Sequence, residues 1–384
     1  MKIVFVSNYF SHHQSALAAA FDFMPDVEFY FVENECMEEE RKAMGWGIEA
    51  PSYVLAHDEQ NASAYNQLID EADVAIIGNV PKWQIERRLK EGKLTFFYSE
   101  RIYKQKSKFY KYPLHKLWFM REGKTSRSAY LLCASAYTAA DYAKTHTFTN
   151  RGYKWGYFPE TKTYDDVDRL IASKKKASLL WVARFINMKH PEVPVEIARR
   201  LKNDGYTFEL NIIGTGELEQ MVTQMVADEG LNDCVHLLGT MKPDEVRIHM
   251  EQSEIFLFTS DRGEGWGAVL NESMNSGCAV VASHAIGSVP YLIKDTENGY
   301  IYRDGDVNDL YTKVKFLLEN EEKRTAVGRN AYRTMITEWN AKTAAVRFVK
   351  LAECLLRGEK NPQPFAAGIC SKAEIVKDDW YTGK

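Results

Sequence analysis

The stretch that decides the fold runs from Phe256 to Gly277 and reads FLFTSDRGEGWGAVLNESMNSG. The apolar run Ile255 to Phe258 predicts a buried strand, and the helical composition of Ala268 to Asn275 ends at Gly277. Between strand and helix, three glycines allow the backbone to pass close to a bulky group: Gly263, Gly265 and Gly267. A strand, a glycine-rich loop and a helix in this order predict one step of a parallel α/β sheet.

Two carboxylates, Glu264 and Glu272, stand on the two sides of this loop. The bare amides and the positive dipole end of the predicted helix suit a phosphate. Ionised carboxylates only accept hydrogen bonds, so they suit the hydroxyls of a sugar and a ribose. A ligand that has both parts is a nucleotide sugar. The alternative is a pair of solvated glutamates at a helix start, which the dipole favours.

The spacing of Glu264 and Glu272 resembles the E-x7-E signature of retaining glycosyltransferases of family 4, also called glycosyltransferase group 1. This resemblance implies the GT-B fold, in which two doubly wound Rossmann-like α/β domains face each other across a cleft. It also implies that Glu264 lies against the transferred sugar and that Glu272 holds the ribose hydroxyls. Further donor contacts are expected at Gly265, Trp266, Gly267, Ala268, Gly214 and Met241.

Two cations follow an upstream strand in the segment Leu179 to Lys189, LLWVARFINMK. Arg184 and Lys189 would lie at the carboxyl end of that strand, the edge where open α/β sheets bind ligands. The pair resembles the R-x4-K element of the family, which neutralises the departing nucleotide diphosphate in place of a metal ion. The alternative is two ordinary surface cations near a helix start, where the dipole mildly disfavours them.

The rest of the chain continues the alternation of strands and helices that is typical of doubly wound sheets. In the second half, strands are predicted within Phe208 to Glu217, Val235 to Met241 and Gly277 to Ile293. In the first half they are predicted at Lys2 to Ser7, Val27 to Val32, Val74 to Ile77, Leu94 to Tyr98 and Tyr130 to Ala134. A chain of 384 residues is longer than one hydrophobic core usually accommodates, so two domains are predicted, 1–160 and 161–356. The tail, about 357–384, is expected to pack back on the first domain.

Candidate acceptor-side groups follow two strands of the first domain. Where the family usually has a glycine-rich loop, this chain reads NYFSHHQ, so His12, His13 and Gln14 either contact the acceptor or simply begin a helix. Glu100 follows the strand Leu94 to Tyr98 and could act as a base toward the acceptor hydroxyl. The alternative for Glu100 is a surface ion pair with Arg101 or Lys104.

Metal ions and cofactors are not expected. Asp304 and Asp306 form a D-x-D pair, but they precede a predicted helix, where Asp is a common N-cap. The six cysteines show no C-x2-C pairing, which favours small buried side chains in a reducing cytoplasm. The N-terminus runs directly into a strand, and no apolar span approaches 18 residues, so neither secretion nor a transmembrane helix is expected.

The segment from Arg101 to Arg127 is basic and aromatic, and Glu122 is its only acid. Its cations include Lys104, Lys106, Lys108, Lys111, Lys116, Arg121 and Lys124, and its rings include Tyr103, Phe109, Tyr110, Tyr112, Trp118 and Phe119. Such a surface could lie on an anionic bilayer, which would make the protein peripheral at the inner membrane face. It could stack on nucleic acid, but a net charge of -4 argues against that partner. The third interpretation is a solvated helix and loop.

Together these features predict a retaining, metal-independent transferase of polysaccharide biosynthesis. It would move a hexose-type sugar from a nucleotide diphosphate sugar to the hydroxyl of a glycan or lipid-linked acceptor. One alternative is an epimerase or hydrolase of nucleotide sugars on the same fold. Another is a noncatalytic sugar-nucleotide-binding protein, suggested by the altered loop at Asn8 to Gln14.

Overall fold

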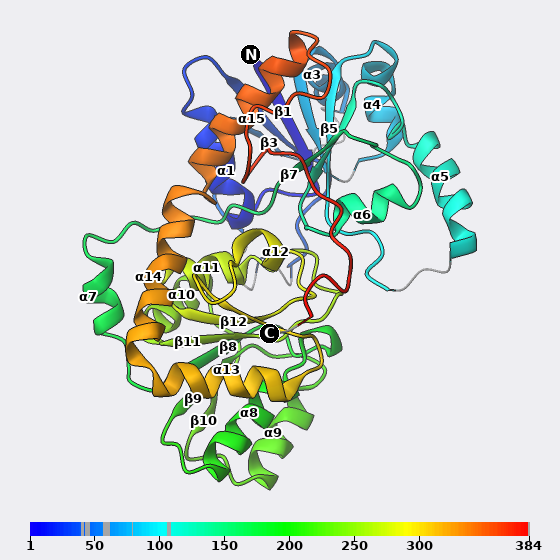
Figure 1. The fold of residues 1–384 in the computed structure, drawn as a ribbon. Helices are drawn as coiled ribbons and strands as arrows, with labels where there is room; N and C mark the ends of the chain where they lie inside the picture. Colours follow the sequence, from blue (N-terminus) through cyan, green and yellow to red (C-terminus); the bar gives the residue numbers. More distant parts are fainter. Residues whose placement is uncertain (40–41, 43–46, 57–61, 79, 106–108, 383–384) are drawn as a thin grey trace. The chain divides into compact units, whose positions relative to one another are not determined.

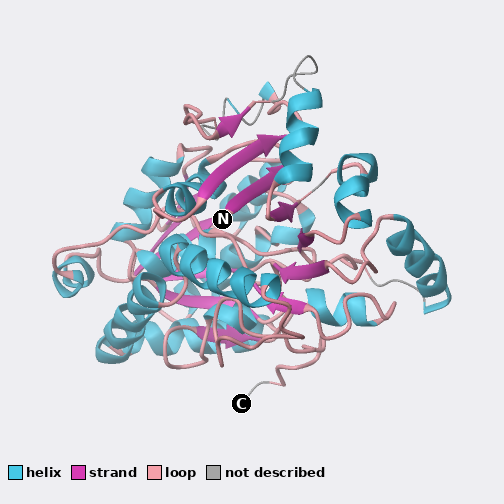
Figure 2. Ribbon diagram, turned by 90° about the horizontal axis from the view of Figure 1, so that it is seen from above, coloured by secondary structure: helices cyan, strands magenta, loops and turns pink. Residues whose placement is uncertain are grey.

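The computed structural model describes residues 1–39, 42, 47–56, 62–78, 80–105 and 109–382 (Figure 1). The chain divides into two compact units. The first contains Met1–Glu160 and Trp339–Lys377, and the second contains Thr161–Glu338 and the tail from Asp378. In both units the strands form a parallel sheet among helices (Figure 2). Among the described helices none has the length and apolar character needed to cross a bilayer.

The first unit is built on a seven-stranded sheet in the order β3-β2-β1-β4-β5-β6-β7. Its strands are β1 (Lys2–Ser7), β2 (Glu28–Glu33), β3 (Val54–Leu55), β4 (Val74–Ile77), β5 (Leu94–Ser99), β6 (Ala129–Cys133) and β7 (Gly152–Lys154). Its helices are α1 (His12–Asp22), α3 (Ala62–Glu71), α4 (Lys82–Lys90), α5 (Tyr112–Arg121), α6 (Thr138–Ala143) and α15 (Ala341–Leu356). The central strands are nearly continuous apolar runs, as expected for a parallel sheet covered on both faces.

Helix α15 completes the core of the first unit, although it follows β7, the last strand of that unit, by almost 200 residues. Phe348 on α15 packs against Phe21, Phe96 and Trp155, with ring centroids 5.6, 4.9 and 5.6 Å away. The structure therefore differs from the predicted domains, because residues 341–356 belong to the first unit rather than the second.

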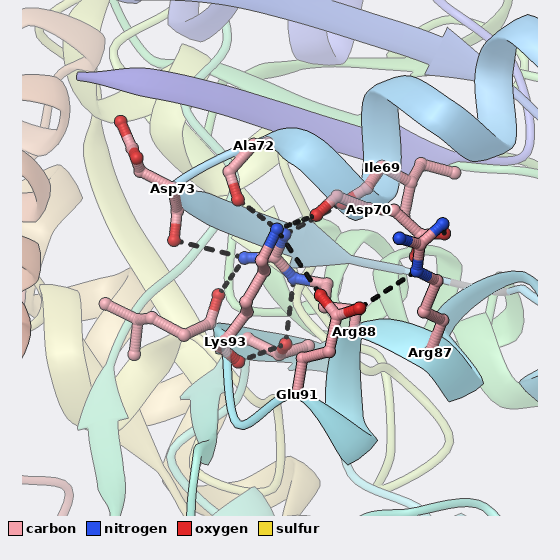
Figure 3. A network of polar contacts seen from close by, with 10 residues as sticks. Ile69, Asp70, Ala72, Asp73, Arg87, Arg88, Glu91 and Lys93 are labelled. Carbon is pink, nitrogen blue, oxygen red and sulfur yellow. Dashed lines mark hydrogen bonds and ion pairs between the residues drawn. The ribbon is translucent and has the colours of Figure 1, made fainter.

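A buried arginine ties α4 to the sheet of the first unit (Figure 3). The guanidinium of Arg88 donates to Thr95 Oγ1 and to four backbone carbonyls, those of Ile69, Ala72, Asp73 and Leu94. Arg88 is fully buried, and burial lowers its pKa to about 10. Its charge is thus compensated by carbonyl dipoles that join the end of α3, the start of β4 and the start of β5.

The second unit has a six-stranded parallel sheet in the order β10-β9-β8-β11-β12-β13. Its strands are β8 (Ser178–Val182), β9 (Glu209–Ile213), β10 (Val235–Leu237), β11 (Ile255–Phe258), β12 (Ala279–Ser283) and β13 (Tyr300–Tyr302). Its helices are α7 (Val167–Ala172), α8 (Glu192–Asn203), α9 (Glu219–Asp228), α10 (Pro243–Gln252), α11 (Val269–Asn275), α12 (Val289–Leu292), α13 (Val307–Glu319) and α14 (Glu321–Thr337). Strands and helices alternate as the sequence predicts.

The C-terminal tail is divided between the two units. Up to Lys377 it stays with the first unit, where the amide of Lys154 donates to the carbonyl of Ser371. From Asp378 it lies on the second unit. There Asp378 pairs with Arg262 at 3.3 Å, and the hydroxyl of Tyr381 donates to the carbonyl of Ile301 at 2.6 Å. The predicted tail thus packs on the first unit only as far as Lys377.

Candidate functional site

The second unit has a topological switch point at β8. This first strand of the unit lies between β9 and β11, so the chain winds away from it in opposite directions. All six strands are parallel, and the loops that follow them leave the same edge of the sheet. Ligands of doubly wound sheets bind outside the carboxyl ends of the strands at this point. The loops after β8 and β11 are the two that flank it.

A lysine from one of these loops meets a glutamate from the other. Lys189, at the end of the 3-10 turn Asn187–Lys189, forms a short ion pair with Glu264 Oε2. Ser260 Oγ donates to the same oxygen at 3.1 Å. Glu264 is only 8% exposed, so Lys189 supplies the charge that makes its burial tolerable. The structure brings together these two predicted site residues, 75 positions apart in sequence.

The glycine-rich loop is fixed by close packing. At Gly267, where φ is +83°, an added Cβ would lie 2.3 Å from the ring of Phe258 and 3.3 Å from Glu264. Trp266 is 1% exposed, and its indole nitrogen donates to Asn271 at 2.9 Å. The Trp266 side chain therefore anchors the loop to α11. Only the backbone of Trp266 can then contact a ligand. Gly265 is buried, and Ala268 stands directly before α11.

Glu272 presents a carboxylate in the first turn of α11. The residue is half-buried, and no donor in the described part of the chain reaches its carboxylate oxygens. Burial raises the pKa of Glu272, and the nearby Arg247 guanidinium opposes that rise. Arg247 itself donates to the backbone carbonyl of Glu272 at 3.2 Å and to Asn275 at 2.9 Å. Arg247 thus fixes the backbone of Glu272, and the Glu272 carboxylate can accept from hydroxyl donors.

Three other predicted donor contacts have different surroundings. Arg184 follows β8 and is exposed. Met241 is half-buried in the loop after β10. Gly214 has a φ of +134°, its amide donates to the carbonyl of Gly239, and an added Cβ would lie 1.9 Å from the carbonyl oxygen of Ala183. Gly214 therefore packs neighbouring loops together, and its amide is already used.

Sequence reasoning missed His190, which extends the site on the side of Lys189. Its Nδ1 lies 2.8 Å from Glu192 Oε1, and its Nε2 lies 3.5 Å from Asp261 Oδ2. The hydrogen bond to Glu192 raises the pKa of His190. The only sequence signal was its position directly after Lys189. This imidazole adds positive charge beside the switch point when it is protonated.

The D-x-D pair divides into two roles. Asp306 is the N-cap of α13 and accepts from the amide of Asp309 at 3.0 Å, which confirms the predicted capping role. Burial and the nearby Asp261 raise the pKa of Asp304, which accepts from Ser283 at 3.4 Å. No cluster suited to a metal ion occurs among the described His, Cys, Asp and Glu residues.

In the first unit the histidines lie at the start of α1. Ser11 is the N-cap, and its hydroxyl donates to Gln14 Oε1 at 2.5 Å, so Gln14 helps to begin the helix. The ring centroids of His12 and His13 are 3.9 Å apart. Burial and the neighbouring His12 lower the pKa of His13 to about 3, which keeps it neutral near pH 7.

Glu100 lies in a small polar cluster after β5. Its carboxylate accepts from Lys104 Nζ at 2.9 Å and from the hydroxyl of Tyr157 at 3.0 Å. The ion pair with Lys104 is therefore formed. Arg101 instead lies buried, with Nε 3.8 Å from Asp141. Tyr157 stands beside Tyr98, with ring centroids 5.7 Å apart, so it links Glu100 to the end of the strand.

The basic aromatic stretch forms an exposed face on α5, at the outer edge of the first unit (Figure 1). Leu114 is 68% exposed and Trp118 is 53% exposed. Lys111, Lys116 and Arg121 are also exposed. Lys106 and Lys108 lie outside the described residues. Lys124 does not share this face: its Nζ lies between 5.1 and 5.8 Å from the ring centroids of Phe97, Trp118, Phe119 and Tyr142.

Residues 165–334 match the family model described as "Glycosyl transferases group 1". The amylovoran biosynthesis glycosyltransferase AmsK of Erwinia amylovora is 34% identical over 184 residues, which are 47% of this chain and 44% of that protein. The putative colanic acid biosynthesis glycosyltransferase WcaL of Escherichia coli is 28% identical over 141 residues, or 35% of this chain and 34% of that protein. The chain thus spans less than half the length of these relatives.

Solved structures resemble the chain over most of its length. HepE of Anabaena, solved with UDP, has a TM-score of 0.67 at 12% identity and covers 92% of this chain and 100% of its own. Sucrose-phosphate synthase of Thermosynechococcus elongatus has a TM-score of 0.65 at 14% identity, with 93% and 100% covered. The structural likeness shows the GT-B fold, and residues 165–334 are similar to glycosyltransferases of group 1.

Proposed function

We propose that the protein is a retaining, metal-independent glycosyltransferase. It would move a hexose-type sugar from a nucleotide diphosphate sugar to the hydroxyl of a glycan or lipid-linked acceptor. The observation that carries this proposal is the meeting of Lys189 and Glu264 at the switch point of the second unit. AmsK and WcaL are named for the biosynthesis of polysaccharides, which favours a glycan pathway.

Each part of the donor has a group of matching chemistry in the second unit. The half-buried carboxylate of Glu272 can accept from both ribose hydroxyls. Lys189 and the exposed Arg184 can neutralise the diphosphate as it leaves, which is the task a metal ion performs elsewhere. Glu264 would face the sugar while Lys189 and Ser260 hold its carboxylate in place. Glu100, held by Tyr157, is proposed as the base toward the acceptor.

Acceptor dependence tests the proposed reaction. The purified chain would be incubated with UDP-sugars and GDP-sugars, with and without glycan or lipid-linked acceptors, and the sugar products would be separated. A transferase releases nucleoside diphosphate rapidly only when an acceptor is present. An epimerase changes the sugar without an acceptor, a hydrolase releases free sugar, and a noncatalytic binding protein turns over none of them. The anomeric configuration of the product, read by NMR, tests retention.

Glu272→Ala is expected to weaken nucleoside diphosphate binding by roughly 10-fold to 150-fold. The reason is that hydrogen bonds to a charged acceptor contribute about 1.5 to 3 kcal/mol. Glu264→Gln should instead lower turnover while nucleotide affinity persists. Titration calorimetry with UDP, the nucleotide bound in the HepE structure, is the first measurement. Glu321→Ala, which removes an exposed glutamate from the first turn of α14, is the matched control. Unchanged affinity in Glu272→Ala would remove the ribose assignment.

We also propose that the exposed face of α5 rests on an anionic membrane that carries the acceptor. Apolar Leu114 and Trp118 would enter the headgroup region, and Lys111 and Arg121, which share their side of the helix by spacing, would contact lipid phosphates. Each near-surface cation contributes about 1 kcal/mol. Replacing both with alanine should therefore weaken binding to anionic vesicles about 30-fold.

Vesicle co-sedimentation measures this effect. Binding of the unaltered protein should fall steeply with salt, because the Debye length shrinks from about 10 Å at 0.1 M to about 3 Å at 1 M. The control variant removes two exposed lysines of α15, Lys342 and Lys350, and should sediment like the unaltered protein. Equal, weak sedimentation of all three proteins on anionic lipid would leave α5 as a solvated face.

A further inference from the structure

A cavity of about 610 Å³ lies in the first unit and takes no part in the reaction proposed above. Its walls come from β6, α6, the segment 146–150 and the tail residues 361–375. Gly152, the first residue of β7, is in its lining. Gly152 marks the amino end of β7, whereas the proposed acceptor-side residues follow the carboxyl ends of β1 and β5. Because the strands are parallel, the cavity therefore lies toward the opposite edge of the sheet. Its volume is within the range of small-molecule sites.

The cavity is firmly built, because the tail pairs with the edge strand β7. The amide of Lys154 donates to the carbonyl of Ser371 at 2.8 Å, and the amide of Cys370 donates to the carbonyl of Lys154 at 2.9 Å. The amide of Ala373 donates to the carbonyl of Gly152 at 3.1 Å. The hydroxyl of Tyr153 also donates a hydrogen bond to the carbonyl of Pro362 at 3.0 Å. These bonds fix Lys372 at the rim of the sheet.

The wall of the cavity concentrates unusual backbone conformations. Three residues at alternate positions, His146, Phe148 and Asn150, have φ values of 53°, 54° and 59°, and Asn361 on the opposite segment has a φ of 51°. Left-handed conformations are uncommon for residues other than glycine, most of all for one as bulky as Phe148. Such conformations cluster at ligand sites, where the surrounding structure holds them.

The lining combines apolar side chains with amides, hydroxyls, the imidazole of His146 and one lysine. Leu131, Phe148 and Ile375 contribute apolar surface, and no Asp or Glu is among the lining residues. Lys372 Nζ donates to the carbonyl of Asn150 at 2.8 Å and to the hydroxyl of Tyr153 at 2.9 Å, and it has no ion pair to any described carboxylate. Burial without a counter-ion lowers the pKa of Lys372 to about 8. The same Nζ lies 4.1 Å from the centroid of the Tyr153 ring. An ammonium has three donors, and two of them have hydrogen-bond acceptors among the described residues, so the third can turn to an anion.

We propose that this cavity binds a small amphiphilic anion, a molecule with an apolar body and one carboxylate or phosphate group. The anionic group would take the remaining donor of Lys372 and supply its missing counter-charge. The apolar body would cover Leu131, Phe148 and Ile375. A lining that combines apolar side chains with convergent polar groups is typical of sites for small molecules.

The first experiment is calorimetric titration of the full chain with octanoate, octyl phosphate, octanol and inorganic phosphate. Octanoate or octyl phosphate should bind saturably, at least tenfold more tightly than either octanol or inorganic phosphate, and the tighter of the two identifies the head group. Lys372→Met should weaken this binding at least tenfold. The matched control is Lys154→Met, because Lys154 is also half-buried but already pairs with Glu374 at 3.1 Å. Equal binding by the Lys372→Met variant, or by octanol, would overturn the proposal.

A second measurement on the unaltered protein covers the case in which Lys372→Met does not fold. Acetylation of individual lysines by acetic anhydride would be followed by mass spectrometry with and without the better probe. The probe should slow acetylation of Lys372 at least fivefold and leave Lys154 unchanged. Failure to protect Lys372 at saturating probe would refute the site.

Discussion

Lys189→Ala is expected to lower turnover about 100-fold, because one charged donor aimed at a developing oxyanion is typically worth a factor of about 100 to 1,000. Arg184→Ala should lower turnover more than tenfold. The two losses should not add when the changes are combined, since both cations act on the same leaving diphosphate. Lys189 also holds the buried Glu264, so its removal disturbs the sugar-facing carboxylate as well.

Steady-state kinetics with saturating acceptor measures these losses. Lys176→Ala, which removes an exposed lysine of the same unit, should retain full turnover. Activity should also survive a strong chelator. If EDTA abolished turnover and Mg²⁺ or Mn²⁺ restored it, the metal-independent mechanism would be wrong, and Asp261 and Asp304 would become the first residues to test as ligands.

Arg88→Leu should lower the free energy of unfolding of the first unit by about 3 to 5 kcal/mol. The change leaves three buried carbonyls and the partly buried carbonyl of Asp73 without this donor. Each unsatisfied buried group costs about 1 to 3 kcal/mol, and relaxation and water recover part of the sum. Arg88→Lys should be intermediate, because three donors cannot serve five acceptors.

The neighbouring Arg87 provides the control, since its side chain is 73% exposed and pairs with the exposed Glu91 at 2.9 Å and only distantly, at 3.9 Å, with Asp70. Arg87→Ala should cost less than about 1 kcal/mol. Two-unit proteins can unfold in separate transitions, so hydrogen exchange at the amides of β4 and β5 should accompany urea denaturation. Equal stability of the Arg87 and Arg88 variants would show that the carbonyl network contributes little.

The fold could be predicted well where strands are continuous apolar runs. The predicted limits of β1, β4 and β11 are those observed, because the interior of each strand is buried on both faces and is an uninterrupted apolar run. The short strands β3, β7 and β13 were not predicted, since two or three residues carry no periodic pattern. The unit to which α15 belongs was missed because an amphipathic pattern shows which face is buried and does not identify the sheet that buries it.

The site could be predicted in its composition and less well in its contacts. The strand order places Lys189 and Glu264 on adjacent loops. Their direct ion pair also depends on the backbone conformation of the two loops, which strand order and motif spacing do not determine. The interpretation of Gly214 as a donor contact missed that its amide already bonds to Gly239. His190 carried no motif, and only its position between Glu192 and Asp261 reveals it.

The late position of α15 in the sequence has a consequence for synthesis on the ribosome. Phe21, Phe96 and Trp155 are all made before the chain reaches Phe348, the ring that they surround in the finished core. At about 5 to 20 residues per second, the 193 residues from 155 to 348 take roughly 10 to 40 s. We therefore expect the first unit to leave the exit tunnel with this aromatic patch uncovered, and we expect chaperones to bind the patch during that interval. Emerging residues 161–338 can meanwhile fold, so the unit that begins first is completed last.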